Sequence, residues 1–140
     1  MTQEIRSFDP QLPAHQLGEA GYCILKQVVP ERLLKQSDIE FGRLTREANE
    51  ILATMHKGGI SPSDYYRSGV NRFIVVPEAS NPAQTCRFEY IQGSSAVFRD
   101  DVIPFCRHWV EQLGGHQFTL FKDKCNLKGP GGGAFTAHQD

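Results

Sequence analysis

Two residues at the end of the sequence, His138 and Asp140, have the types and the spacing of metal ligands. Because residues i and i+2 of an extended segment point to the same side, their imidazole and carboxylate would face one point in space. Two histidines and one carboxylate form the facial triad that holds non-haem Fe(II) and leaves positions open for a co-substrate and dioxygen. His138 and Asp140 would supply two of these three ligands, although a surface strand with two polar groups carries the same short pattern.

The residues before this pair form a strand-like run that ends in a break. Polar and apolar side chains alternate along the run, which predicts one polar and one apolar face, with Asp123 as an exception. The polar face consists of Lys122, Lys124, Asn126 and Lys128, and the apolar face of Phe121, Cys125 and Leu127. The Gly-Pro-Gly-Gly-Gly segment at 129–133 ends the run, because proline lacks a donor and glycine favours bends.

This order of elements is similar to a known family. Asn126-x-Lys128, a Pro/Gly-rich loop and His138-Gln139-Asp140 resemble the phytanoyl-CoA dioxygenase-like family of Fe(II)- and 2-oxoglutarate-dependent oxygenases. The resemblance is good over the last quarter of the sequence and only general elsewhere. It implies an α+β fold with a single domain over residues 1–140. Helices within residues 1–115 would pack on the first strands of a double-stranded β-helix, a jelly-roll barrel of the cupin type, which residues 116–140 begin but do not complete.

The resemblance also implies roles for individual residues. His138 and Asp140 would be the catalytic metal ligands for Fe(II). Lys128 would bind 2-oxoglutarate, together with Asn126 two residues earlier. These residue types suit the task, because a dianion in a low-dielectric pocket needs cationic and amide donors.

Lys122 and Lys124 share the parity of Lys128, and we expect them to face the co-substrate or the substrate. On an ordinary sheet, lysines at alternate positions instead mark the side that faces solvent. Both interpretations are open from the sequence.

The activity implied by the resemblance is hydroxylation or desaturation of a small molecule with dioxygen, with succinate and CO2 as co-products. Asp140 favours these reactions over halogenation, because halogenating relatives replace this carboxylate with a small residue. In this family the second iron-binding histidine and an arginine for 2-oxoglutarate follow well after the His-x-Asp motif. We therefore expect residues 1–140 to be the amino-terminal half of an oxygenase, inactive alone, with the missing carboxy-terminal half as a partner.

Two alternatives belong to other classes of function. One is a non-catalytic or zinc-occupied small-molecule-binding module of the same barrel lineage. The other is a structural or interaction domain in which the His-x-Asp pattern is coincidental.

The composition argues against several classes of partner. The 15 Lys and Arg residues nearly balance the 16 Asp and Glu residues and form no stripe, so no nucleic acid partner is predicted. No stretch reaches the roughly 18 apolar residues that a membrane span needs, and the start shows no secretory signal. The sequence therefore predicts a soluble, cytoplasmic protein without a membrane partner. The four cysteines lack zinc-finger spacing and are expected to be reduced and mostly buried: Cys23, Cys86, Cys106 and Cys125.

The elements that must position the candidate ligands begin with helices. Residues 9–21 predict a short helix that ends at a glycine, and the β-prone residues 22–29 predict a strand. A long helix is expected to start at Pro30 and end near Gly58. Its apolar residues recur every three or four positions, which predicts one buried stripe.

The middle of the chain predicts a long loop and two short strands. The loop spans residues 60–70, and aromatic and basic residues in and just after it are candidates for a substrate mouth, although such residues are ordinary in loops: Tyr65, Tyr66, Arg67 and Arg72. Residues 73–76 predict a strand, and residues 87–91 a strand or the edge of a helix.

Residues 94–113 return to helical spacing. Pro104 predicts two pieces, because proline is tolerated only in a first turn. We expect Asp100 or Asp101 to cap the second piece. His108 in this helical segment and His116 at its exit are predicted to be surface residues.

Overall fold

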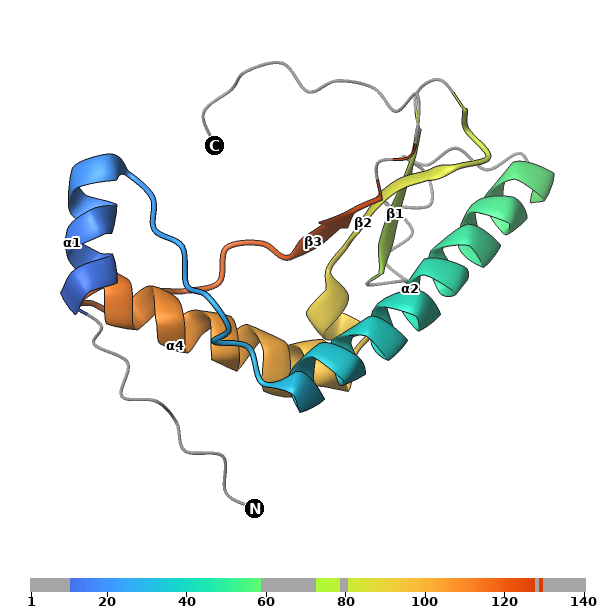
Figure 1. The fold of residues 1–140 in the computed structure, drawn as a ribbon. Coiled ribbons are helices and arrows are strands. Elements are labelled where there is room, and N and C mark those ends of the chain that lie inside the picture. Colours follow the sequence, from blue (N-terminus) through green and yellow to red (C-terminus); the bar gives the residue numbers. More distant parts are fainter. Residues whose placement is uncertain (1–10, 59–72, 79–80, 128, 130–140) are drawn as a thin grey trace.

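The computed structural model describes residues 11–58, 73–78, 81–127 and 129 (Figure 1). This part of the chain is α+β, with three α-helices and one open, three-stranded antiparallel sheet in the order β1-β2-β3. The elements are α1 (Gln11–Ala20), α2 (Glu31–Gly58), β1 (Ile74–Pro77), β2 (Thr85–Glu89), the turns η1 (Ile91–Gly93) and η2 (Phe98–Val102), α4 (Ile103–Gly114) and β3 (Lys124–Asn126). The α+β prediction is confirmed, but the described strands form an open sheet and not a closed barrel.

Helix α2 is the main support of the sheet. It begins directly after Pro30, whose fixed φ suits a helix start, and Glu31 places a negative charge at the positive end of the helix dipole. Helix α2 runs along one face of the sheet (Figure 1), and apolar residues of the predicted stripe pack against that face. The fully buried members of the stripe at this contact are Leu44, Ala48, Leu52 and Met55.

The core lies between α2 and the sheet. Val75 of β1 pairs with Phe88 of β2, and Phe88 pairs with Cys125 of β3, so one residue from each strand faces the helix. Phe88 is fully buried, and its ring lies 5.2 Å from the ring of Phe73 and 6.0 Å from that of Phe41. These aromatic contacts fix the sheet on the helix, because edge and tilted ring pairs add to the burial of apolar area.

The strand predicted for residues 22–29 is wrong. In the structure these residues connect α1 to α2 as an irregular segment in which Ile24 is exposed. Gln27 has a φ of 59°, which an extended strand cannot contain. The β-prone residues gave a local preference, but a strand also needs a partner, and none of the described residues pairs with this segment. The short helix before it is confirmed as α1, and it ends at Gly21 in the left-handed conformation, with φ 75°.

The two helical pieces predicted around Pro104 are continuous in the structure. The five-residue π-turn η2 leads directly into α4, and Pro104 lies in the first turn of α4, as predicted. The predicted cap is wrong, because Val102 occupies the N-cap position of α4 and makes no side-chain hydrogen bond. The backbone at Val102 is already helical, so α4 has no free start to cap. Asp100 instead pairs with Arg99 at 2.9 Å. Gly115, with φ 69°, ends α4.

Several smaller predictions can be compared with the structure. His108 and His116 are exposed, as expected. None of the four cysteines forms a disulfide. Three of them are half-buried, whereas Cys106 is exposed, and the expectation of burial is wrong for it. No described helix has the length and apolar character that crossing a membrane requires. The loop predicted over residues 60–70 and its candidate mouth residues lie outside the described residues.

Candidate functional site on the polar face of the sheet

The side of the sheet opposite α2 carries charged and amide side chains. Glu89 of β2 lies opposite Lys124 of β3, and Arg87 lies opposite Asn126. Residues directly opposite in an antiparallel pair project to the same side, and their neighbours along each strand project to the other. These four residues, together with Lys122, are called the polar face below.

Glu89 is the centre of the polar face. Only 4% of its surface is exposed, and its two carboxylate oxygens have different cationic partners. Arg87 Nε donates to Oε1 at 2.6 Å, and Lys122 Nζ lies 2.8 Å from Oε2. Burial by itself would raise the pKa of Glu89, but the hydrogen bonds from Lys122 and Arg87 outweigh it and hold the pKa below its ordinary value. Glu89 is therefore ionised at neutral pH and neutralises part of the charge of both cations.

The predicted substrate residues Lys122 and Lys124 differ in their surroundings. Lys122 lies before β3, and its ammonium is paired with Glu89. Lys124 is exposed on the polar face, as is Asn126, which we predicted to bind 2-oxoglutarate. Among the described residues, no hydrogen bond or ion pair engages the Lys124 ammonium or the Asn126 amide. Lys124 and Asn126 are thus the members of the predicted set that the structure leaves available to a ligand.

The alternation predicted for this segment holds only from Lys124 onward. Cys125 and Leu127 pack against the core, as predicted for the apolar face. Burial, followed by the nearby charge of Asp123, raises the pKa of the Cys125 thiol, which favours its protonated form at neutral pH. Phe121, predicted on the same apolar face, is 95% exposed. The prediction for Phe121 is wrong, because the strand begins three residues later and its alternation does not apply there.

Two hydrogen bonds explain why Asp123 departs from the alternation of polar and apolar residues. Its carboxylate accepts a hydrogen bond from the backbone N–H of Gln92 at 2.7 Å, and its carbonyl accepts one from the N–H of Tyr90 at 3.2 Å. Tyr90 has the left-handed φ of 62°, which ends β2 and starts η1. Asp123 therefore holds the start of β3 against the turn that follows β2.

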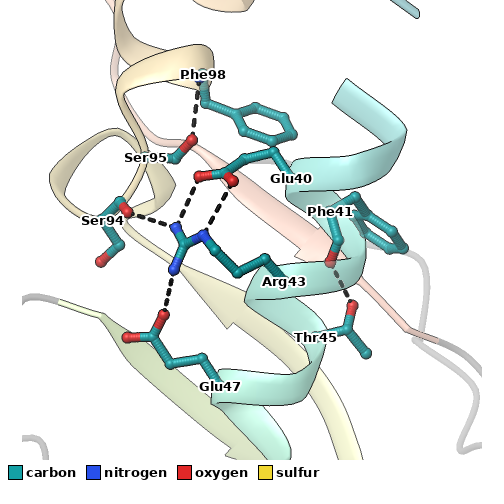
Figure 2. Close-up of polar contacts among 8 residues, drawn as sticks. All are labelled: Glu40, Phe41, Arg43, Thr45, Glu47, Ser94, Ser95 and Phe98. Carbon is teal, nitrogen blue, oxygen red and sulfur yellow. Dashed lines mark hydrogen bonds and ion pairs between the residues drawn. The ribbon is translucent and has the colours of Figure 1, made fainter. Parts of the chain in front are cut away.

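A second cluster fixes that turn to α2 (Figure 2). Arg43 pairs with Glu40 at 2.7 Å and with Glu47 at 2.8 Å, and its Nη2 also donates to the carbonyl oxygen of Ser94 at 2.8 Å. The Arg43 hydrogen bond is the main reason that the pKa of Glu40 is lowered. The same hydrogen bond, followed by the charges of Glu40 and Glu47, raises the pKa of Arg43. The cluster joins α2 to the segment just after η1. The turn that follows Glu89 is therefore held by Asp123 on one side and by Arg43 on the other.

A cavity of about 260 Å³ opens beside Glu89. Its lining includes the side chains of Glu89, Tyr90 and Asp123 and the ends of the paired segment at Phe121 and Lys122. The cavity thus joins the charged cluster to the surface, at the end of the polar face where Lys122 approaches Glu89.

The predicted ligands His138 and Asp140 lie outside the described residues, and so does Lys128. Within the described ranges, no group of three His, Cys, Asp or Glu side chains is placed to hold a metal ion. The roles of these three residues therefore stay predictions.

Two members of the site, Glu89 and Arg87, are not among the residues predicted from the sequence. A signal was present, since Arg87-x-Glu89 places opposite charges at i and i+2 around the apolar Phe88. Such a triplet predicts a charged pair on the face of a strand that does not pack in the core. That a third charge, from Lys122, would join the pair depends on the strand register, which the local sequence does not contain.

Comparisons with known proteins give no relative for this chain: no family model, curated protein or solved structure matches it.

Proposed function

We propose that this chain is part of a dioxygenase of the phytanoyl-CoA dioxygenase-like kind, dependent on Fe(II) and 2-oxoglutarate, that hydroxylates or desaturates a small molecule. Succinate and CO2 would be the co-products. The observation that carries the proposal is the separation of the two sheet faces. Helix α2 covers one face, while Lys124 and Asn126 project from the other. Asn126 also begins the Asn126-x-Lys128 element, which the Pro/Gly-rich loop and His138-Gln139-Asp140 follow in the sequence. In this proposal the three strands are part of a jelly-roll barrel, and the polar face lines its interior.

The charge of the polar face suits an organic dianion. Arg87, Lys122 and Lys124 contribute three positive charges, and Glu89 contributes one negative charge, so the net charge is +2 (three minus one). A surface with a net positive charge attracts anions and lowers the cost of removing their water. The amide of Asn126 adds a neutral donor that can orient a carboxylate or a keto oxygen.

Each residue has a part in the proposed reaction. His138 and Asp140, with a second histidine, would hold Fe(II), which supplies the activation of dioxygen when bound. Lys128 and Asn126 would bind and orient 2-oxoglutarate. Lys124 would draw the anion to the polar face.

Glu89 would act on the site through other residues. By pairing with Lys122 and Arg87, Glu89 holds both cations and the approach to β3 in one position.

The test is release of succinate from 2-oxoglutarate by the full-length gene product, with and without Fe(II), in the presence of candidate substrates. We expect iron-dependent release that falls at least about a hundredfold in His138→Ala and Asp140→Ala, since metal ligands are essential to such chemistry. Lys124→Ala should raise the half-saturating concentration of 2-oxoglutarate, whereas Lys26→Ala, at an exposed lysine outside the sheet, should not.

Absence of iron-dependent succinate would overturn the proposal. It would favour the non-catalytic or zinc-occupied module, particularly if 2-oxoglutarate still bound in a manner sensitive to Lys124→Ala.

A further inference from the structure

A second and larger cavity lies between α4 and the segment that returns from it. Gly115 reverses the chain, and residues 117–123 then run back alongside α4 towards β3 (Figure 1). The space between them has a volume of about 300 Å³. Its apolar wall comes from Ile103 and Val110 of α4 and from Phe118, Leu120 and Phe121 of the returning segment. The cavity shares Phe121 and Lys122 with the smaller cavity beside Glu89.

Exposed apolar side chains gather at this cavity. Phe121 is 95% exposed, Val110 45% and Phe118 39%, although all three are large and apolar. None of the residues of α4 is buried, in contrast to the stripe of α2. An apolar surface of this kind marks a binding site more often than an isolated exposed side chain does, because covering it removes unfavourable contact with water.

The charges at the cavity select the chemistry of the ligand. Arg107 lines the cavity, and its guanidinium forms no hydrogen bond or ion pair with any described residue. Lys122 also lines it, but its ammonium is paired with Glu89. The described lining contains no Asp or Glu side chain. One available cation beside an apolar wall complements a ligand with one anionic group and an apolar body.

We propose that this cavity binds a free monocarboxylate with an unbranched apolar chain. The carboxylate pairs with Arg107, whose planar fork can donate two parallel hydrogen bonds to it. The chain lies against Val110, Phe118 and Leu120. A cavity of this size is at the small end of ligand sites, so the fitting chain has roughly eight to ten carbons. Apart from Lys122, which also belongs to the polar face, the lining residues are outside the proposed iron and 2-oxoglutarate set, and binding needs neither Fe(II) nor 2-oxoglutarate.

Cys106 provides a direct readout of occupancy. It is exposed, free and part of the cavity lining, so a bound ligand should slow its alkylation. The experiment measures N-ethylmaleimide labelling of Cys106 by peptide mass spectrometry, without Fe(II) or 2-oxoglutarate. The probes are hexanoate, octanoate, decanoate and uncharged decanol, each kept monomeric. Labelling of Cys23, which lies outside the cavity lining, serves as the internal reference.

We expect decanoate to protect Cys106 at the lowest concentration, with a loss of about fourfold in affinity for each methylene removed. Arg107→Gln should weaken protection by decanoate about tenfold, since a charge-assisted pair is lost. The matched control Arg46→Gln removes an exposed arginine on α2 and should change nothing. Val110→Gln should flatten the dependence on chain length, because it replaces part of the apolar wall with an amide.

Four outcomes would overturn the inference. Decanol could protect as well as decanoate, or Arg107→Gln could bind decanoate as the unchanged protein does; either would remove the role of the charge. Protection that rises with protein concentration alone would show that a second copy covers the cavity. Protection by anionic phospholipid vesicles but not by free decanoate would identify a membrane surface instead. Because the assay contains no iron, its result is independent of whether succinate is produced in the test of the proposed function.

Discussion

The two faces of the sheet are formed by the same strands but carry different side chains, apolar on one face and charged on the other. On the α2 side, Val75, Phe88 and Cys125 meet apolar residues of the helix. On the polar face, one residue further along β2, Glu89 is equally buried but is satisfied by two cations. The apolar core therefore lies on one face, and the charges of the other face can be changed without removing an apolar contact of that core. The predictions below test that separation.

The largest effect is expected at the centre of the core face. Phe88→Ala should lower the free energy of unfolding by about 3–5 kcal/mol, because it removes a fully buried ring and leaves a cavity. Chemical denaturation followed by far-UV circular dichroism measures this. A cost below about 1 kcal/mol would mean that the sheet does not depend on α2 for its stability.

Two adjacent valines of β1, Val75 and Val76, face opposite sides of the sheet and allow a matched comparison. Val75 is buried against the core, whereas Val76 is half-buried on the other side. Val75→Ala should cost about 2 kcal/mol and Val76→Ala less than about 1 kcal/mol, since the same methyl groups are removed from different surroundings. Equal losses in denaturant melts would contradict the proposed division between the faces.

Glu89 tests the polar face itself. Glu89→Gln should cost about 1–2 kcal/mol, because the charge-assisted bonds to Arg87 and Lys122 weaken while both cations can still reach water. Differential scanning fluorimetry against Glu19→Gln, an exposed glutamate on α1, provides the control. An unchanged melting temperature in Glu89→Gln would show that the cluster contributes nothing to stability.

Acid should weaken the protein through the same carboxylates. The folded pKa values of Glu89 and Glu40 are lowered, so the stability they contribute is present above the ordinary value of 4.5 and is lost as the pH falls through their folded pKa values. The free energy of unfolding should therefore decrease below about pH 4.5. Glu89→Gln and Glu40→Gln should each flatten this decrease, and a slope as steep in both variants would exclude these residues as its source.

The smallest effect on folding is expected at the outer residues of the polar face. Lys124→Ala and Asn126→Ala should each change the free energy of unfolding by less than about 0.5 kcal/mol, because their exposed side chains have no bond to lose with the described residues. Equilibrium urea titration of both variants measures the change. A loss above about 1 kcal/mol would assign them a structural role in place of a role in binding anions.

Elements with a repeated pattern could be predicted from the sequence. Helix α2 has both a start signal at Pro30 and a long apolar stripe, and the structure confirms it nearly residue for residue. The strand at 73–76 was also predicted, and β1 covers Ile74–Pro77. Such patterns are local, because each residue contributes to the same periodic signal.

Features that depend on pairing could not be predicted. The β-prone residues 22–29 form no strand in the structure, because propensity does not supply a partner. The sequence alone does not single out Glu89, because its two partners depend on the register of β2 with β3 and on the position of Lys122. The proposed metal ligands His138 and Asp140 came from the order of motifs, and their arrangement is still a prediction.

The double attachment of Asp123 has a consequence for how this protein tolerates changes in length. The carbonyl and the carboxylate of Asp123 accept hydrogen bonds from the backbone N–H groups of Tyr90 and Gln92. These two bonds set the register of β3, and the connection from α4 does not. Residues added just after Gly115 would therefore enlarge the bend without shifting which side chains face each other across the last two strands. The connection beside the apolar cavity is thus free to vary in size while the charged surface keeps its geometry.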